Sequence, residues 1–393
     1  MIALDTERKL AILGEQAQFD VSAPNEPLLR REGPSRAEAR TVEAMKRYIY
    51  PAAVSGGKCM PVLKVLMTNA CRNDCHYCAT RCSADIRRTQ FQPEELARVF
   101  LEMEQRRLVQ GLFLSSGIAG EPDRVQQAIV DTAAILRLKH GYRGYLHLKV
   151  LPGASDAAIE ETVRYASRAS VNLEAPNAQR LACLAEDKRF ADQLGRALQR
   201  TSEYARAMRL RSGVTTQYVV GAAGESDAEL IHTTDLLYRK LGLRRAYYSG
   251  FRPIEGTPLE DVPAATNERV HRLYQADFLL RQYDFGADEI VLDGDGNLPG
   301  GMDPKQSWAA AHQDFFPVEL TTADREALLR VPGIGPLSAG RIVHARRAGL
   351  GREEKDLAAM GVWASRAARY VTVGGRPLGR RVNGQLELPF GEL

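Results

Sequence analysis

The chain has 393 residues, of which 44% are hydrophobic and 26% are charged, an ordinary composition for a soluble globular protein. No apolar run is long enough to cross a membrane, and the first 20 residues lack the apolar segment of a secretory signal, so we expect a cytoplasmic protein. The net charge is only +4, but residues 330–381 hold eleven Lys and Arg against three acids, a net of +8. This asymmetry is explained equally well by a polyanionic partner and by a solvated basic surface.

Residues 1–50 read as a charged helical lead-in, and residues 51–290 alternate between strand and helix patterns. Between the strand-prone runs lie amphipathic helical stretches, and this alternation predicts βα units around a parallel sheet. We expect an α/β fold, a partial (β/α)6 TIM-like barrel, in which ligands lie at the carboxyl ends of the strands. The strand-prone runs are PVLKVLMT (61–68), GLFLSS (111–116), GYLHLKVLPG (144–153), SVNLEAPN (170–177), TTQYVVGA (215–222) and RAYYSGFRP (245–253).

A glycine-rich stretch opens a linker that we place at residues 291–320, and a small all-α domain is expected at 321–375, followed by a tail at 376–393. Thr321 and Asp324 form a capping-box pattern in front of the first helix of that domain.

Cys71, Cys75 and Cys78 follow the first expected strand with the spacing C-x3-C-x2-C. Three thiolates on one short loop suit a 4Fe–4S cluster, each binding a different iron and leaving one iron open for a substrate or cofactor. Cys82 extends the set and leaves a second interpretation, a closed four-thiolate zinc or iron–sulfur site. Cys59 and Cys183 are expected to be small core residues.

The three cysteines, with Tyr77 directly before the last one, resemble the signature of the radical S-adenosylmethionine (SAM) superfamily. The resemblance implies a 4Fe–4S cluster whose open iron binds SAM. It also implies a one-electron donor such as flavodoxin or ferredoxin, and a 5′-deoxyadenosyl radical that abstracts hydrogen from a substrate.

The same resemblance implies SAM contacts at the ends of other strands. Ser115, Ser116 and Gly117 stand where the superfamily usually has a Gly-Gly-Glu segment, and the usual acid is missing here. Asn172 and Glu174 at the fourth strand end match positions that hold the ribose and carboxylate of SAM. Gly221 after the fifth strand is similar to the adenine-side glycine.

The segment LLRVPGIGPLSAGRIVHARR resembles a helix-hairpin-helix DNA-binding motif. Its turn at Gly333, Ile334 and Gly335 is expected to offer backbone N–H groups to a phosphate. Arg341, Arg346 and Arg347 are expected to meet the DNA backbone. The alternative is a hairpin used only for packing or protein contact.

Apolar residues are expected to pack the hairpin, and a second, degenerate copy follows it without the Pro-Gly turn. The packing residues are Leu329, Ile334, Ala339 and Ile342 in the first copy and Leu357, Val362 and Ala367 in the second.

Together the two halves resemble, over residues 45–372, a family of radical SAM proteins assigned to DNA modification or repair and linked to a uracil-DNA glycosylase-like partner. Tyr247, Tyr248 and Arg252 near the barrel mouth are then candidate contacts to an extruded nucleotide. Two alternatives stay open: an RNA- or tRNA-modifying radical SAM enzyme, and a non-catalytic nucleic-acid-binding protein with a structural iron–sulfur or zinc site.

Overall fold

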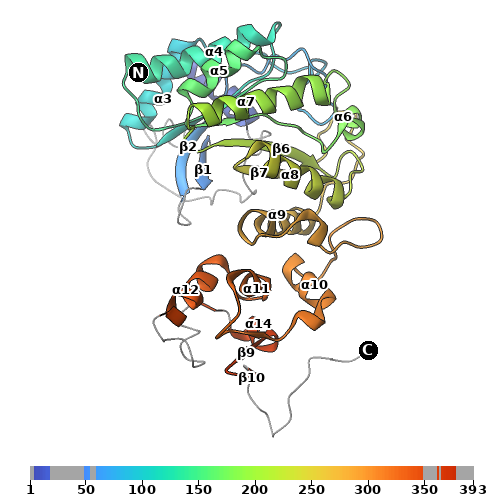
Figure 1. The fold of residues 1–393 in the computed structure, drawn as a ribbon. Coiled ribbons are helices and arrows are strands. Elements are labelled where there is room, and N and C mark those ends of the chain that lie inside the picture. The colour runs from blue at the N-terminus through green and yellow to red at the C-terminus, as the bar shows by residue number, and fades with distance from the viewer. Residues whose placement is uncertain (1–3, 18–47, 54–58, 348–360, 363, 378–393) are drawn as a thin grey trace, which may run out of the picture. The chain divides into compact units, whose positions relative to one another are not determined.

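The computed structural model describes residues 4–17, 48–53, 59–347, 361–362 and 364–377. These residues form two compact units (Figure 1). Within the described part, the first unit runs to Glu225 and includes Leu236–Val270. The second comprises Ser226–Asp235 and the residues from His271 onward. The division falls inside two helices, α8 (Asp227–Leu241) and α9 (Asn267–Gln282).

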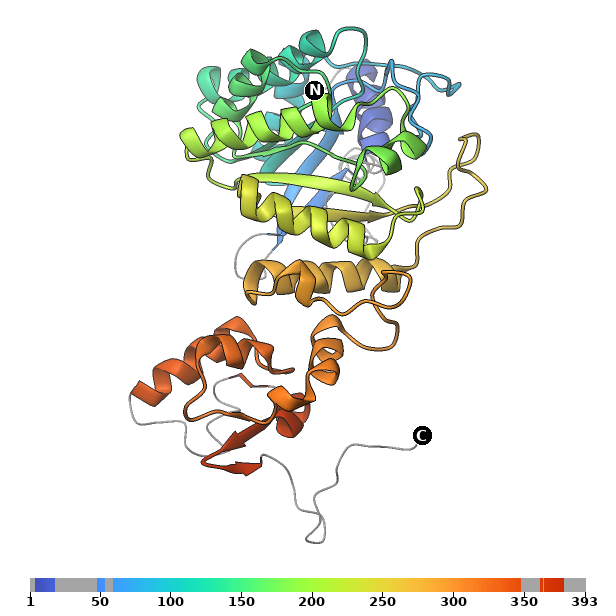
Figure 2. The same cartoon turned by 45° about the vertical axis from the view of Figure 1, so that its right-hand side comes forward.

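The first unit is built on a seven-stranded sheet whose strands follow one another in chain order. An antiparallel pair at one edge joins β1 and β2, and β2 to β7 are parallel neighbours. The sheet curls into a half-barrel (Figures 1 and 2), which confirms the expected α/β partial barrel. The strands are β1 (Ile49–Ala53), β2 (Cys59–Leu66), β3 (Gly111–Ser115), β4 (Tyr145–Lys149), β5 (Arg168–Ser170), β6 (Val214–Val220) and β7 (Arg245–Gly250).

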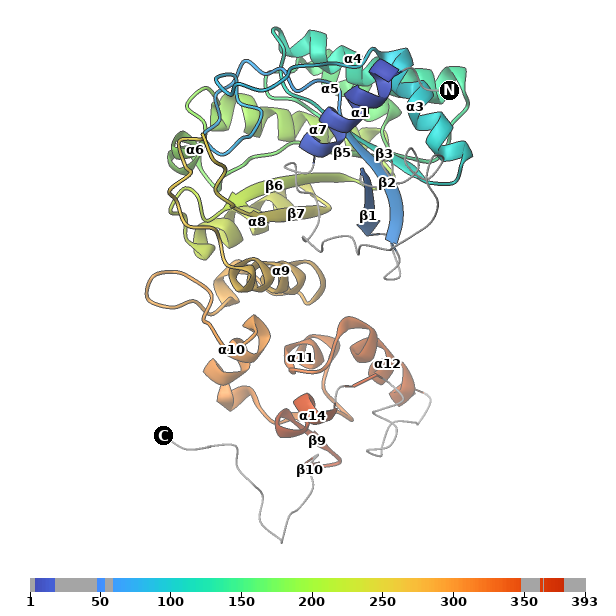
Figure 3. The same ribbon diagram turned by 180° about the vertical axis from the view of Figure 1, so that it is seen from behind.

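Helices between the strands cover the outer face of the sheet, and α1 (Leu4–Ala17) lies beside β2 (Figure 3). Their starts are marked by capping residues: the side chains of Ser155 and Asn177 accept the backbone N–H groups of Ala158 and Arg180. The connecting helices are α3 (Pro93–Gln105), α4 (Pro122–Ala134), η1 (Ile135–Lys139), α5 (Asp156–Tyr165), α6 (Ala178–Leu184), η2 (Phe190–Gly195) and α7 (Arg196–Ala207).

Alternate residues of β2, β3 and β4 face these helices and form the main core. Because successive side chains of a strand point to opposite faces, the outer face takes every second residue. These outer residues are all buried in one apolar cluster with residues of α1, α3 and α4: Leu63, Val65, Leu112, Leu114, Leu146 and Leu148. The inner face of the half-barrel carries the intervening residues.

The second unit contains a helical hairpin and a three-stranded sheet of order β10-β9-β8. Its elements are η3 (Ala287–Glu289), α10 (Pro304–Ala311), η4 (Gln313–Phe315), β8 (Val318–Glu319), α11 (Arg325–Arg330), α12 (Pro336–Arg347), α14 (Ala364–Ala367), η5 (Ala368–Tyr370), β9 (Val371–Val373) and β10 (Arg376–Pro377). The four residues expected to pack the hairpin are buried in one core, which confirms that packing. Val362 and Ala367 join the same core, whereas Leu357 lies outside the described residues.

Two details of the second unit correct the sequence analysis. Asp324 alone caps α11, because its carboxylate accepts the N–H of Ala327 at 2.7 Å. The hydroxyl of Thr321 instead donates to Glu319 at 2.6 Å. The Glu319 carboxylate also accepts backbone N–H groups from Gly374 and Gly375, and so ties β8 to the β9–β10 turn.

Two details of the first unit also differ from expectation. The strand expected at 170–177 is β5, which ends at Ser170, and the following residues form a loop. Cys59 and Cys183 are both exposed, so the expectation that they are core residues is wrong. Among the described helices, none has the length and apolar character needed to span a bilayer.

Candidate active site

The three cysteines lie on the loop that joins β2 to α3, here called the cysteine loop (residues 67–92). The loop leaves the carboxyl end of β2, the edge of a parallel sheet where ligands bind in barrel folds. Cys75 is buried, and Cys71 and Cys78 are half-buried. The N–H of Ile118, just after β3, donates to the Cys71 sulfur at 3.5 Å. The structure thus brings these thiols to the expected edge of the sheet.

Arg88 holds the cysteine loop in shape from within. Its guanidinium donates to four backbone carbonyls, which lie both before and after the cysteines. The distances are 2.6 Å to Asn69, 2.9 Å to Thr80, 2.5 Å to Arg81 and 2.9 Å to Ala84. One side chain therefore satisfies carbonyls that the irregular backbone leaves without strand or helix partners.

Asp74 braces the middle of the loop. Its carboxylate accepts two hydrogen bonds from Arg81, at 2.8 and 2.5 Å, and the Ser83 hydroxyl at 2.8 Å. The hydrogen bond from Arg81 is the main reason that the pKa of Asp74 lies well below its usual range. The exposed thiol of Cys82 also points to this carboxylate, with a sulfur–oxygen distance of 3.5 Å.

Backbone contacts fix the cysteine loop to the neighbouring strand and helix. The N–H of Gly117 donates to the carbonyl of Thr68, and the N–H of Arg72 donates to the carbonyl of Ile118, both at 2.8 Å. At Gly117 the two backbones approach so closely that a Cβ would lie 2.4 Å from the Ala70 carbonyl oxygen. On the other side, the N–H of His76 donates to the last residue of α6 at 2.8 Å.

Three thiols on one loop form a donor set that fits an iron–sulfur cluster, since a cubane takes each thiolate on a different iron. Among the described residues, no three His, Cys, Asp or Glu side chains converge on a single metal ion. Burial raises the pKa of Cys75 to about 11 and also raises the pKa of Cys78. The free thiols of Cys75 and Cys78 are therefore protonated at neutral pH, and loading of a cluster releases their protons.

Lys188 is a buried cation that contacts both Glu174 and Tyr77 and that the sequence did not indicate. The Lys188 ammonium lies 3.1 Å from the Glu174 carboxylate and 3.3 Å from the Tyr77 hydroxyl. The side chains of the ion pair are only 7% and 9% exposed. Glu174 has a φ of +65°, so the backbone accepts a left-handed conformation to direct this side chain inward. Lys188 lies in an irregular stretch after α6, where no periodic pattern marks it.

The other residues expected to contact SAM lie along the same edge. Ser115 is buried at the end of β3, and the hydroxyl of Ser116 accepts the N–H of Thr68 at 3.3 Å. Asn172 is half-buried in the loop after β5. Gly221 directly follows β6 with a φ of +96°, and its N–H donates to the buried Glu225 at 2.5 Å.

The three expected substrate residues are separated by the structure. Tyr247 points to the inner face, where its hydroxyl accepts a hydrogen bond from Arg168 at 3.3 Å. Tyr248 points to the opposite face and is 2% exposed against Tyr218, because neighbouring strand residues face opposite ways. Its position corrects the expectation of a substrate contact. Arg252 is exposed just beyond β7.

The expected DNA contacts in the second unit also have distinct positions. Gly333 has a φ of +87° in the turn, and Gly335 is half-buried. The Ile334 side chain is buried, and its carbonyl accepts the Lys305 ammonium at 2.6 Å. Arg341 and Arg347 are exposed on α12. Arg346 instead donates to the Ala323 carbonyl at 2.5 Å, so it holds the hairpin to the preceding loop.

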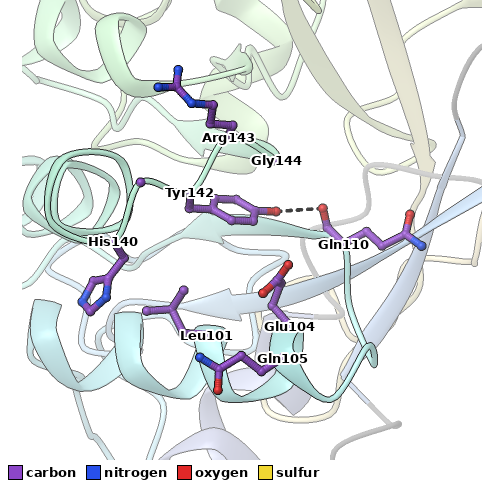
Figure 4. Close-up of a pocket in the computed structure, with 9 residues that line it drawn as sticks. Leu101, Glu104, Gln105, Gln110, His140, Tyr142, Arg143 and Gly144 are labelled. Carbon is purple, nitrogen blue, oxygen red and sulfur yellow. Dashed lines mark hydrogen bonds between the residues drawn. The ribbon is translucent and has the colours of Figure 1, made fainter.

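A pocket of about 490 Å³ lies away from the cysteine loop (Figure 4). It is lined by residues of α3 and of the segments that lead into β3 and β4, among them Glu104, Gln110, His140 and Tyr142. Gln110 and Gly144 directly precede their strands, so this pocket is at the amino end of the sheet. It does not belong to the site built around the three cysteines.

One protein-family model matches part of the chain. Residues 65–237 match the model of the Radical SAM superfamily, a segment that includes the cysteine loop, Glu174, Lys188 and Gly221. No curated protein matches the chain.

Several solved structures resemble the fold. HydG, described as a maturase of the [FeFe]-hydrogenase, has a TM-score of 0.45 and 15% identity, covering 71% of this chain and 61% of its own. HydG from Carboxydothermus hydrogenoformans has a TM-score of 0.44 and 16% identity, covering 55% and 50%. Methylornithine synthase (PylB) has a TM-score of 0.42 and 15% identity, covering 70% and 76%. The chain thus spans about 61% or less of the length of the two HydG structures.

Proposed function

Because residues 65–237 form a domain of the radical SAM superfamily, which uses a 4Fe–4S cluster and SAM, we propose that this protein is an enzyme that modifies or repairs DNA. The observation that carries the proposal is the cysteine loop, which holds three thiols at the carboxyl edge of a half-barrel. When bound, the two cofactors supply a 5′-deoxyadenosyl radical that abstracts hydrogen from a substrate.

Residues at the carboxyl edge of the half-barrel have distinct roles in this proposal. Cys71, Cys75 and Cys78 would hold the cluster, on a loop whose shape Arg88 supports through its contacts with backbone carbonyls. Glu174 and Lys188 form a buried ion pair next to the cysteine loop, where Lys188 holds the Tyr77 ring in place.

The choice of DNA is supported by the hairpin of the second unit. Arg341 and Arg347 are exposed on α12, and the turn before that helix contains Gly333 in a left-handed conformation. The turn suits a phosphate at the start of α12, and the exposed arginines further along the helix suit contacts to other phosphates, which orient a duplex without reading its sequence. The one-electron donor that radical SAM enzymes need and a uracil-DNA glycosylase-like partner complete the proposal.

The radical step is tested by SAM cleavage. Anaerobically reconstituted protein with dithionite is expected to convert SAM to 5′-deoxyadenosine. The variant Cys78→Ala loses this activity, whereas Cys183→Ser, at an exposed cysteine on α6, keeps it. Absence of cleavage by protein with a complete cluster contradicts the proposal.

The DNA step is tested by binding across a salt series. Each phosphate contact contributes about 0.9 to the slope of log K against log salt, so the double variant Arg341→Gln/Arg347→Gln is expected to lower the slope by about 2. Arg164→Gln, an exposed arginine on α5, is the matched control. Tighter binding of folded RNA than of duplex or single-stranded DNA favours the RNA-modifying alternative.

A further inference from the structure

Lys305 is a lysine of the second unit whose side chain is buried. It follows Pro304 in the first turn of α10, where Asp303 caps the helix by accepting the N–H of Gln306 at 3.0 Å. The residue is only 9% exposed. Burial of a lysine costs free energy unless its ammonium has partners, so the contacts of Lys305 indicate what it does.

The ammonium of Lys305 binds the turn of the helical hairpin. It donates to the carbonyl of Ile334, the middle residue of the expected phosphate-binding turn, at 2.6 Å. The N–H of Ile334 donates to the Val331 carbonyl at 3.1 Å and closes the turn from the other side. Lys305 therefore fixes the peptide group that joins Ile334 to Gly335.

This peptide group links Lys305 to the N–H of Gly335. The peptide bond is trans, so its carbonyl and its N–H point in opposite directions, and the Gly335 N–H points away from Lys305. A cation at the carbonyl end also polarises the peptide group and makes its N–H a stronger donor. Lys305 thus acts on both the direction and the strength of an N–H in the turn, the properties on which a bound phosphate depends.

Tyr283, directly after α9, supports both the lysine and the turn. The Lys305 ammonium lies 4.6 Å from the centre of the Tyr283 ring, and a Cβ added to Gly335 would lie 3.4 Å from the Tyr283 hydroxyl. Arg330 on α11 donates to the Tyr283 carbonyl at 3.0 Å and so joins the hairpin to the same residue. The turn is therefore held against a fixed support, and a displacement of it would break several contacts at once.

Besides this tyrosine, three charged groups act on Lys305: Asp303 at the start of α10, Arg330 on α11 and Arg366 on α14. The Asp303 carboxylate pairs with Arg366. Arg330 pairs with Glu289 at 2.7 Å. Burial, together with the two arginines, outweighs the Asp303 carboxylate and lowers the pKa of Lys305 to about 7. The lysine therefore gains or loses its positive charge close to neutral pH.

We propose that Lys305 is a positioning residue for DNA binding, whose ammonium fixes the turn of the hairpin and strengthens its contact with a phosphate. This inference rests on the proposed function and gives a role in DNA binding to a residue that acts through the turn. A phosphate at the turn favours the charged form of Lys305, because it brings a negative charge close to the ammonium. Protonation of Lys305 and binding of DNA therefore strengthen each other by the same factor.

The first test measures binding of a labelled DNA duplex by the full chain with its cluster, at constant ionic strength between pH 6 and pH 8.5. The wild type is compared with Lys305→Met, which removes the charge and the donor and keeps an unbranched side chain. The ratio of the two affinities is expected to fall by about threefold from pH 6 to pH 8.5, because the wild type loses its charge. Other titrating groups, such as His344 on α12, are common to both proteins and cancel in the ratio.

The second test measures the stability of the second unit without DNA. Tryptophan fluorescence follows its thermal unfolding, because both tryptophans of the chain, Trp308 and Trp363, fall in its range of residues. Above pH 7 the unfolded chain keeps the proton that the folded chain loses from Lys305, so stability rises with pH. Relative to Lys305→Met, the melting temperature of the wild type is expected to rise by about 5 °C from pH 6 to pH 8.5. A lysine that only supports the fold would not weaken DNA binding while stability rises.

The outcomes separate this inference from the proposed function. Gln306→Met, at the next position of α10, is the matched control and is expected to behave as the wild type in both tests. If duplex DNA binds and the affinity ratio stays constant across the pH range, this inference is overturned and the proposed function stands. A wild-type stability that falls with pH relative to Lys305→Met also overturns it. If the chain binds no duplex at any pH, the DNA part of the proposed function fails, and this inference fails with it.

Discussion

Replacement of Gly117 by alanine tests how tightly the cysteine loop depends on its neighbour. A Cβ at this position would lie 2.4 Å from the carbonyl oxygen of Ala70 and 3.3 Å from that of Thr68. Both atoms belong to the backbone, so no flexible side chain can move aside. The two backbone segments, around Gly117 and around Ala70, must separate by about 1 Å to reach ordinary van der Waals contact, at about 3.5–4.0 Å.

The magnitude follows from the contacts that such a separation breaks. The hydrogen bond from Gly117 to Thr68 and the one from Arg72 to Ile118 are both 2.8 Å long, and each contributes about 1 kcal/mol. Overpacking adds about 1–3 kcal/mol. We therefore expect Gly117→Ala to destabilise the first unit by about 3–5 kcal/mol. For a unit of this size, that corresponds to a fall in the melting temperature of about 6–20 °C.

The assay combines thermal unfolding followed by circular dichroism with iron and sulfide analysis after anaerobic reconstitution. The variant is expected to unfold earlier and to hold less cluster, because Ile118 also donates to the Cys71 sulfur. Gly300→Ala is the matched control, since its Cβ meets open space. If Gly117→Ala melts with the wild type and binds a full cluster, the steric reasoning is wrong.

Three further predictions concern charge and thiol chemistry. Lys188→Met leaves the Glu174 carboxylate buried without its partner, so we expect the free energy of unfolding in urea to fall by about 3 kcal/mol. The double variant with Glu174→Gln is expected to recover part of this loss. Equal stability of the wild type and both variants contradicts the prediction. Cys82→Ala is expected to keep its cluster in iron analysis while Cys78→Ala loses it, and equal loss in both would indicate a four-thiolate site. Burial raises the pKa of Glu319, but the hydrogen bonds that its carboxylate accepts outweigh burial and lower the pKa to about 2, from 4.5 in the unfolded chain. The ionised Glu319 therefore stabilises the folded state above pH 4.5, and this stabilisation is lost as the pH falls toward 2. Unfolding of the second unit between pH 5 and 2 is expected to show about 2 kcal/mol less pH dependence in Glu319→Gln, and identical profiles would refute it.

The sequence predicted the parallel part of the sheet because its strands are short apolar runs with regular helical stretches between them. It did not predict β1, because Ile49–Ala53 is followed by glycines and becomes a strand only by pairing with β2. The strand expected at 170–177 was displaced to Arg168–Ser170, because regular pairing with β6 stops after Ser170 and returns only as an isolated bridge between Glu174 and Tyr218. Tertiary contacts decide such positions, and local composition does not encode them.

In the candidate site, the sequence predicted the cysteine motif but not the contacts between residues far apart in the chain. Cys71, Cys75 and Cys78 stand within eight residues, so their spacing alone indicates a shared ligand. Lys188 reaches Tyr77 only through folding, across 111 residues of chain. The grouping of Lys64, Lys149, Arg168 and Arg245 on one face of the sheet likewise depends on strand register, because four separate strands contribute one residue each.

Arg88 has a consequence for how the metal centre is assembled. The Arg88 guanidinium binds carbonyls from both ends of the cysteine loop. The loop therefore has its shape before a cluster binds. Binding of the cluster then orders few additional residues, so the entropic cost of ordering the chain is small. We therefore expect the three thiols to take up a cluster without refolding of the surrounding half-barrel.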